Sequence, residues 1–401
     1  MIFHLALFAA TLNPMQPDAR SIKRFCLSVF AICLVVSASA QTMQQRLLES
    51  LDKIPHPKSA ADFQAAGSLP CLNQDKTQVC WSFATCSFLE SEMARLKLPA
   101  ARLSVMYPVY CGYLEKARRY VQTKGASRFS PGDLFTGLPD ACREYGAMPA
   151  SVFDKPSAAG VFDQTRLYPE LEDCMRDVKL HGQWDEARVL SRVKKILNRH
   201  LGEPPKTFSF QGKTYTPRTF VTEIVRLPWA EYVMLTSFES APFNTFTALG
   251  VPDNWRHNTN FFNVPLSVFY DALKGALTAG YSAAIDLDTS EPSYETTGRY
   301  CFIPDFDIPA AQITQAARDL RFLNGATSDD HAIHLIGCTS IGGEDWFLAK
   351  DSWKVAWRDG NRGRLFLHSS YVKLKVLAFL VHRDGVPEVT ALLPTPSQPA
   401  R

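Results

Sequence analysis

Apolar residues recur at helical spacing in the segment that runs from Trp81 to Leu96. The residues that set this period are Phe83, Cys86, Leu89, Met93 and Leu96, widened by Ala84 and Phe88. So broad an apolar stripe predicts a buried helix. Helical patterns also cover residues 103–122 and a shorter segment that Gly146 should end. A clear helix is predicted over "LSVFYDALKGALTAG", with Ser267 as its N-cap and Gly280 as its stop.

Short apolar runs typical of strands dominate the last third of the chain. They are "YSAAIDLD", "AIHLIGCTS", "DWFLAKDSW", "GRLFLHSS" and "LKVLAFLVH". Gly342 and Gly343 supply a turn between the second and third of these runs. Helices therefore dominate before about residue 280, and antiparallel strands are expected to dominate after it. This segregation predicts an α+β protein whose site lies between a helical half and a sheet half.

The N-terminal segment has the pattern of a secretory signal. A basic stretch with Arg20, Lys23 and Arg24 precedes an apolar run over residues 25–36, and small residues end at Ala40. The sequence therefore predicts a signal peptide over residues 1–40, with cleavage near Ala40 and a periplasmic or secreted product. Met15 is an alternative start, and retention of the segment as an uncleaved anchor is the other outcome. Residues 387–401 are Pro-rich and are expected to form a loose tail.

Composition and charge narrow the class of protein. The chain has 401 residues, a net charge of +3 and 46% apolar residues, and it has no long Lys/Arg block. These values favour a folded globular protein and argue against nucleic acid as a partner. Eight cysteines follow the predicted signal, too few for a disulfide scaffold, and no CxxC pair indicates a zinc or dithiol site.

Cys80 is placed to be a nucleophile. It precedes the predicted 81–96 helix, where unpaired N–H groups and the helix dipole favour a thiolate. Gln74 lies six residues upstream and could donate to an oxyanion beside the Cys80 backbone N–H. Cys86 is interpreted as a core residue. For Cys71, a disulfide and a place at the cleft entrance both stay open.

Three ordered segments resemble the papain-like cysteine peptidases. "NQDKTQVCWSF" resembles the nucleophile segment of that family, and "DDHAIHLIGC" resembles its Asp-His-Ala segment. "FLAKDSWKVAW", followed by "GRLFLH", resembles its Asn-Ser-Trp-Gly segment. About 250 residues separate Cys80 from His331, which is closer to the bleomycin hydrolase and aminopeptidase C branch than to compact members. The resemblance covers roughly residues 65 to 386. It implies a two-lobed peptidase domain over residues 41–386, with a large insertion between the cysteine and the histidine.

The resemblance implies a role for several residues. Cys80 would be the nucleophile, His331 the general acid/base and Gln74 an oxyanion donor. Trp353 would shield the bond between His331 and residue 351, while Trp81 and Asp330 would shield the site or contact substrate. No cofactor or metal is implied. His334 is set aside because residues three apart on a strand face opposite sides.

The third member of the site departs from the family pattern. Asp351 stands where the family has Asn, and Lys354 stands where it has Gly. An Asp carboxylate can accept the outer imidazole N–H as an Asn amide does. Its negative charge should also raise the histidine pKa. The substitution is therefore compatible with a Cys-His-Asp triad, with an altered pH range or with lost activity. Asp305 and Asp307, in the Pro-bounded segment "PDFDIP", are interpreted as solvated loop residues.

The expected function is that of an exported cysteine peptidase acting through a Cys80 thioester. The resemblance implies aminopeptidase activity, with peptides or proteins as substrates. Endopeptidase activity stays open, as does the oligomeric state. Two other classes are also open: a binding protein on an inactive peptidase fold, and an acyltransferase that uses the same nucleophile. No membrane partner is expected beyond an uncleaved signal.

Overall fold

The computed structural model describes residues 42–393. The chain divides into two compact units, residues 1–52 and 53–401. In the first unit, residues 42–52 are helical, and the predicted signal peptide with its cleavage near Ala40 lies outside the described residues. No helix within residues 42–393 is both long and apolar enough to cross a membrane.

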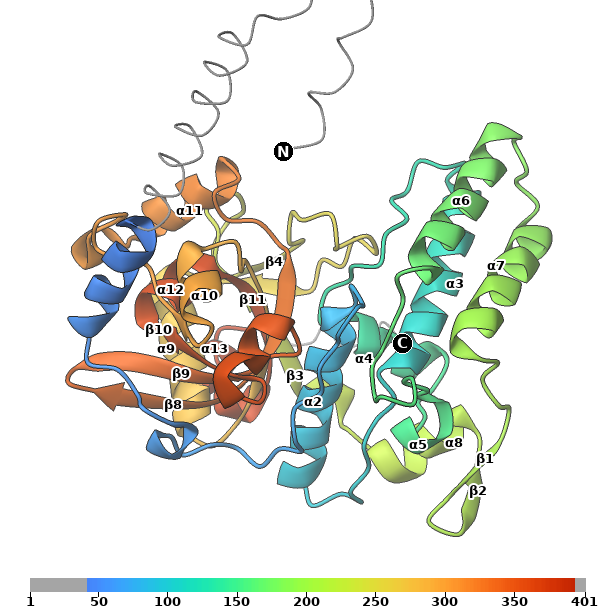
Figure 1. Ribbon diagram of the computed structural model, residues 1–401, viewed down its shortest axis with the longest axis horizontal. Coiled ribbons are helices and arrows are strands. Elements are labelled where there is room, and N and C mark those ends of the chain that lie inside the picture. The colour runs from blue at the N-terminus through green and yellow to red at the C-terminus, as the bar shows by residue number, and fades with distance from the viewer. Residues whose placement is uncertain (1–41, 394–401) are drawn as a thin grey trace, which may run out of the picture. The chain divides into compact units, whose positions relative to one another are not determined.

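Helices make up the N-terminal half of the second unit (Figure 1). They are α2 (Cys80–Arg95), α3 (Met106–Gln122), α4 (Gly137–Glu144), α5 (Ala150–Phe153), α6 (Leu167–Leu180) and α7 (Glu186–Leu201). Helix α3 packs on α7, and α2 packs on both α4 and strand β8 (His331–Ile341). Because α2 has neighbours on both sides, it lies between the helices and the sheet and is buried nearly all round.

A mixed sheet of nine strands, counted within residues 42–393, forms the other half. Its spatial order is β4 (Thr245–Thr247), β5 (Phe261–Asn263), β3 (Tyr232–Thr236), β11 (Val376–His382), β6 (Ala283–Leu287), β8, β9 (Glu344–Lys350), β10 (Arg364–His368) and β7 (Tyr300–Cys301). Most pairs are antiparallel, but β3 with β5 and β10 with β7 are parallel. The apolar side of this sheet packs against α9 (Leu266–Thr278) in a second core cluster.

The remaining helices and strands are short. They are β1 (Phe208–Phe210), β2 (Lys213–Tyr215), α8 (Pro217–Phe220), α10 (Pro292–Thr297), α11 (Gln315–Leu323), α12 (Ser369–Lys375) and α13 (Pro387–Thr390). Short 3-10 or π-helical segments are η1 (Ala60–Asp62), η2 (Val221–Val225), η3 (Trp229–Glu231), η4 (Ala310–Gln312), η5 (Lys354–Gly360) and η6 (Arg383–Gly385). The predicted loose tail thus begins with helix α13, whose Val389 is buried, and residues 394–401 lie outside the described residues.

The predicted α+β class and the main helices are confirmed, with two corrections. The N-cap of α9 is Pro265, and Ser267 lies inside the first turn. The Gln315 side chain accepts the Leu266 N–H at 2.7 Å, so a distant residue caps this helix and Ser267 is not needed. The second correction is that β3 and β5, which precede residue 280, join the main sheet. Because β3 and β5 are short, their sequences show no clear period of apolar residues.

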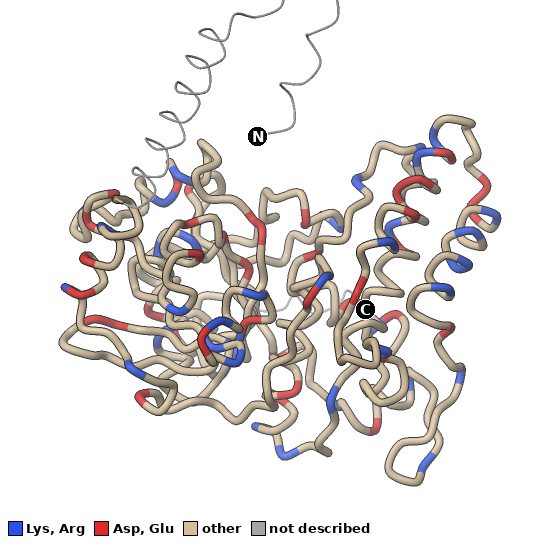
Figure 2. Tube along the Cα trace, viewed as in Figure 1, with Lys and Arg blue, Asp and Glu red and all other residues tan. Residues whose placement is uncertain are grey.

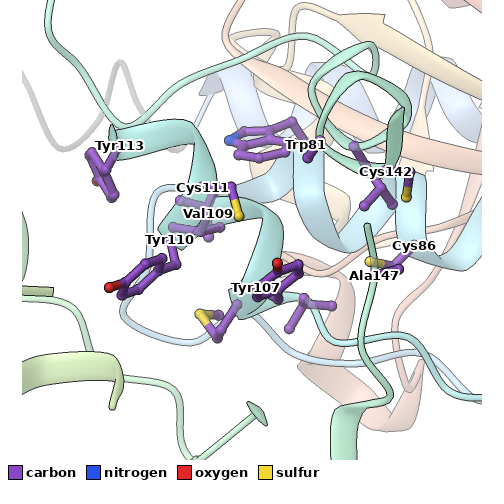
Figure 3. Close-up of a cluster of buried hydrophobic side chains, with 14 of the residues drawn as sticks. Trp81, Cys86, Tyr107, Val109, Tyr110, Cys111, Tyr113, Cys142 and Ala147 are labelled. Atoms are coloured by element: carbon purple, nitrogen blue, oxygen red, sulfur yellow. The ribbon is translucent and has the colours of Figure 1, made fainter. Parts of the chain in front are cut away.

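A buried cluster joins α2, α3 and α4 (Figure 3). Trp81 points from α2 toward this cluster, and Cys86, Cys111 and Cys142 lie in it as small apolar residues. The core interpretation of Cys86 is confirmed because its side chain is only 1% exposed. Basic and acidic residues are interspersed over both halves of the described chain (Figure 2).

Candidate active site

Cys80 is the first residue of α2, the helix that lies between the two halves. The helix start is held in place because the Ser82 hydroxyl donates to the Val105 carbonyl at 2.6 Å and the Trp81 indole N–H donates to Pro131. Cys80 is half-buried and faces a cavity of about 520 Å³. Its thiol therefore sits at a fixed helix N-terminus, where the unpaired N–H groups favour a negative charge.

His331 begins β8 and comes from the opposite half of the fold. Its main chain pairs with Leu287 of β6, which fixes the side on which the ring emerges. The ring Nε2 lies 2.8 Å from Asp351 Oδ1, and Cys80 lies close enough to the same ring to raise its pKa. Since Nε2 is engaged by Asp351, Nδ1 is left for Cys80. The three side chains form a line of nucleophile, imidazole and carboxylate.

Asp351 follows strand β9, and three donors surround its carboxylate. Oδ1 accepts the His331 Nε2–H and the Trp353 backbone N–H, the latter at 2.8 Å. Oδ2 accepts the Tyr294 hydroxyl at 2.7 Å. Tyr294 lies on α10, and sequence reasoning missed it because no motif or spacing marks it. A buried carboxylate with three donors is well satisfied, so Asp fits where the resembled family has Asn.

The electrostatics of His331 favour its charged form. Burial by itself would lower the His331 pKa, but the Asp351 carboxylate and Cys80 raise that pKa well above its ordinary value. Tyr294 stays a neutral donor, because burial and the Asp351 carboxylate both raise its pKa. The arrangement therefore supports an imidazolium beside the sulfur near neutral pH.

Gln74 is held with its amide in one orientation. Its Oε1 accepts the Ser352 hydroxyl at 2.6 Å, and its Nε2 donates to the Thr77 carbonyl at 3.1 Å. The second Nε2 proton remains, and Gln74 lines the same cavity as Cys80. Ser352 was not singled out from the sequence, although it directly follows Asp351.

The other predicted site residues divide between the cavity and the core. Trp353 and Asp330 line the cavity together with His331, and the Asp330 carboxylate accepts the Thr289 N–H at 2.8 Å. Trp81 instead lies in the helical core, with its ring against Gly112 and Gly137. Trp81 is not among the described residues that line the cavity.

The residues set aside in the sequence lie away from the reacting groups. His334 is fully buried and pairs with the Ser87 hydroxyl at 2.9 Å. Asp307 forms an ion pair with Arg321, and Asp305 is exposed. The exposed Lys354 places its ammonium 5.2 Å from the Trp353 ring centre.

Neither a metal cluster nor a disulfide is found among the described residues. Among residues 42–393, no group of three His, Cys, Asp or Glu side chains is arranged to hold a metal ion. None of the cysteines in this part of the chain is in a disulfide. Cys71, whose role was open, donates to the Gly363 carbonyl at 3.2 Å and borders a small cavity behind Asp351.

Several known proteins are similar to this chain in sequence or in fold. The chain is 23% identical over 374 residues to aminopeptidase W of Lactobacillus delbrueckii, covering 80% of this chain and 83% of that protein. It is 23% identical over 364 residues to aminopeptidase C of Listeria monocytogenes, covering 78% and 79%. The crystal structure of PepW from Lactobacillus rhamnosis superposes with a TM-score of 0.65 at 16% identity, covering 96% and 95%. This likeness confirms the expected fold. No protein-family model matches the chain.

Proposed function

Because this chain is a papain-like cysteine peptidase, we propose that Cys80 is its nucleophile and that it removes residues from the N-termini of peptides. The observation that carries the proposal is the line from Cys80 through His331 to Asp351, which borders a cavity. A thiolate with an oriented base and waiting oxyanion donors is the requirement for acyl transfer.

The reaction has two half-steps. The Cys80 thiolate attacks the substrate carbonyl carbon, and the oxyanion is held by the Gln74 amide and the Cys80 N–H. The carbon–nitrogen bond then breaks as the His331 imidazolium gives its proton to the leaving amine, which leaves a thioester. In the second half-step His331 takes a proton from water, the hydroxide attacks the thioester, and the acid leaves as the thiolate re-forms.

Asp351, Tyr294 and Ser352 act through other residues in this mechanism. Asp351 fixes the His331 ring and stabilises its positive charge, while Tyr294 holds the carboxylate in place. Ser352 orients the Gln74 amide. Trp353 borders the cavity next to His331, which supports its proposed role in excluding water.

Aminopeptidase activity is the finer part of the proposal. It is supported by the names of the two relatives, aminopeptidase W and aminopeptidase C. The basic and apolar pattern of residues 1–40 supports export of the enzyme to the periplasm or the medium.

A peptide-library digest with wild type and Cys80→Ala tests the function. We expect wild type to shorten free peptides one residue at a time from the N-terminus, and Cys80→Ala to leave them intact. Internal cleavage that depends on Cys80 would show that the enzyme is an endopeptidase and not an aminopeptidase. Transfer of the acyl group to added amines in place of water would identify an acyltransferase.

Alkylation separates an active site from an inactive binding fold. At pH 6 an ordinary thiol, with a pKa of about 8.5, is almost wholly protonated and reacts slowly with iodoacetamide. We expect rapid modification of Cys80 at this pH and slow modification in His331→Ala. Equal, slow rates in both proteins would contradict a working nucleophile and favour the binding protein.

A further inference from the structure

A carboxylate outside the predicted site residues borders the same cavity as the imidazole. Asp253 lies in the loop 248–260 and lines the same cavity as Cys80 and His331. A Cβ atom placed on Gly132 would lie only 2.0 Å from Asp253 Oδ2. The carboxylate therefore rests directly on the Gly132 backbone.

The loop that carries Asp253 is held in place by its neighbours. The Asn254 side chain donates to the carbonyls of Leu249 and Asn258, both at 3.0 Å. Arg256 forms ion pairs with Asp133 and Glu115 at 2.7 Å, which tie the loop to the helical half. Because both sides of Asp253 are anchored, its carboxylate is a built part of the cavity wall.

The direction of the reaction assigns this wall to the acyl part of the substrate. The leaving amine must face the His331 ring, because that ring gives it a proton. The residue that contributes the carbonyl must then lie along the other wall, where Gly132 borders the cavity beside Cys80. Because Asp253 lies against Gly132, a chain that continued past this residue along Gly132 would approach the Asp253 carboxylate. The Asp253 carboxylate thus places a negative charge at the end of the wall that faces the acyl part of the substrate.

Two further carboxylates, those of Asp329 and Asp286, lie near enough to Asp253 to interact with it electrostatically. Asp329 Oδ2 is buried without a hydrogen-bond partner among the described residues. Asp286 is 1% exposed, and its oxygens share one long contact with the Phe135 N–H at 3.3 and 3.4 Å. Burial raises the pKa of Asp329 and of Asp286 well above the ordinary value, and neighbouring carboxylates raise both further. These groups need a proton or an external cation.

The nearby basic side chains do not fully meet that need. The buried Lys116 ammonium donates to the carbonyls of Ser130 and Gly132, and Arg256 is paired as described. Arg128 lines the cavity but is exposed. Burial raises the pKa of Asp253, and Lys116 and Arg128 offset this only in part. No donor to the Asp253 carboxylate is found within residues 42–393.

We propose that Asp253, backed by Asp329 and Asp286, binds the free α-ammonium group of the substrate's N-terminal residue and so limits cleavage to one residue. This inference rests on the proposed function and names the residue that would give it its exo-specificity. An α-ammonium has three N–H donors and one positive charge, which matches a carboxylate with open acceptors at the end of the acyl wall.

The kinetic test compares a free with a blocked amine. Leucyl-aminomethylcoumarin and its N-acetyl derivative are cleaved by wild type, Asp253→Asn and, as a matched control, Asp271→Asn on the exposed side of α9. We expect Asp253→Asn to lower kcat/KM for the free amine by about 10- to 100-fold, chiefly through KM, because a charge-assisted hydrogen bond is lost. Cleavage of the acetylated substrate should not fall, and Asp271→Asn should match wild type on both.

Several outcomes would overturn the proposal. Wild type could cleave both substrates equally, or Asp253→Asn could slow both by the same factor, as a structural defect would. A wild-type preference for acetyl-arginyl-leucyl-aminomethylcoumarin over its acetyl-alanyl counterpart, lost in Asp253→Asn, would mean that the carboxylate takes a basic side chain instead.

A binding measurement keeps the test independent of turnover. In the Cys80→Ala background, calorimetry should show leucinamide binding about 10-fold or more tighter than N-acetyl-leucinamide, and Asp253→Asn should remove the difference. If leucinamide binds in this way but wild type cleaves nothing, the proposed function fails and the ammonium site stands. If cleavage depends on Cys80 but the two amides bind alike, the ammonium site fails and the peptidase stands.

Discussion

At the scale of single residues, the carboxylate at position 351 decides how the site titrates. Asp351 accepts from His331, Trp353 and Tyr294, so three donors hold its charge in place. A neutral amide at this position would orient the ring but would not attract the imidazolium. The pH range of activity is therefore where the departure from the family pattern should be visible.

Replacing Asp351 by Asn should move the alkaline limb of the pH profile of kcat/KM. Asp351 raises the pKa of His331, and the imidazolium is the acid that must persist, so activity falls as pH rises through that pKa. Without the negative charge we expect the limb to shift by about 1 to 3 units toward lower pH. Stopped assays between about pH 5 and pH 10, a range that spans ordinary His titration, measure the position of the alkaline limb.

Tyr294→Phe is the matched control for that prediction. It removes one donor from Asp351 but leaves the negative charge beside His331, so the alkaline limb should stay or move to higher pH. An alkaline limb that is the same in wild type and Asp351→Asn would show that the carboxylate does not set the charge of the imidazole.

At the scale of elements, α2 is unusual because it is buried on nearly every side and still carries acidic residues. Glu92 forms an ion pair with Arg95 at 2.7 Å. Glu90 accepts the Leu103 N–H at 2.9 Å and lies 3.5 Å from Arg102, but its Oε2 has no hydrogen-bond partner among the described residues. Burial raises the pKa of Glu90 to about 7, despite the opposing effect of Arg102. The helix that presents Cys80 therefore contains a destabilising group.

Glu90→Gln should stabilise the protein more at pH 7 than at pH 5. The folded-state pKa of Glu90 lies above its unfolded value, so wild type loses stability as pH rises between the two, and Gln removes this loss. We expect the free energy of unfolding in urea to gain about 1 to 3 kcal/mol more at pH 7 than at pH 5. Glu388→Gln, at an exposed position, is the control. An equal effect of Glu90→Gln at both pH values would contradict the buried charge.

At the scale of the whole molecule, the long interval between Cys80 and His331 does two things. It adds β3, β4 and β5 to one side of the sheet, and it carries the loop with Asp253 into the cavity. This interval thus contributes Asp253 to the lining of the candidate site. The order of the motifs along the chain does not predict the contact between Asp253 and Gly132, because this contact forms only when both halves have folded.

Export is a prediction about the full chain. Expressed from Met1 or Met15 in a bacterial host, the protein should appear outside the cytoplasm with a mature N-terminus near Gln41, because the basic and apolar pattern before Ala40 is typical of a secretory signal. Cell fractionation and mass spectrometry of the N-terminus measure this. A chain starting at Gln41 is the control and should stay in the cytoplasm. An intact N-terminus in the cytoplasmic fraction would contradict the signal.

The amino-acid sequence alone determined the class of fold, the main helices and the last strands, because these have periods that reflect which face is buried. It also determined the candidates Cys80, His331, Gln74 and Asp351, because local motifs carry them. The tertiary structure decided what surrounds them. Tyr294 and Asp253 come from segments without a period or a motif, and Trp81 lies in the core. Contacts between residues far apart in the chain depend on packing, which leaves no local pattern to interpret.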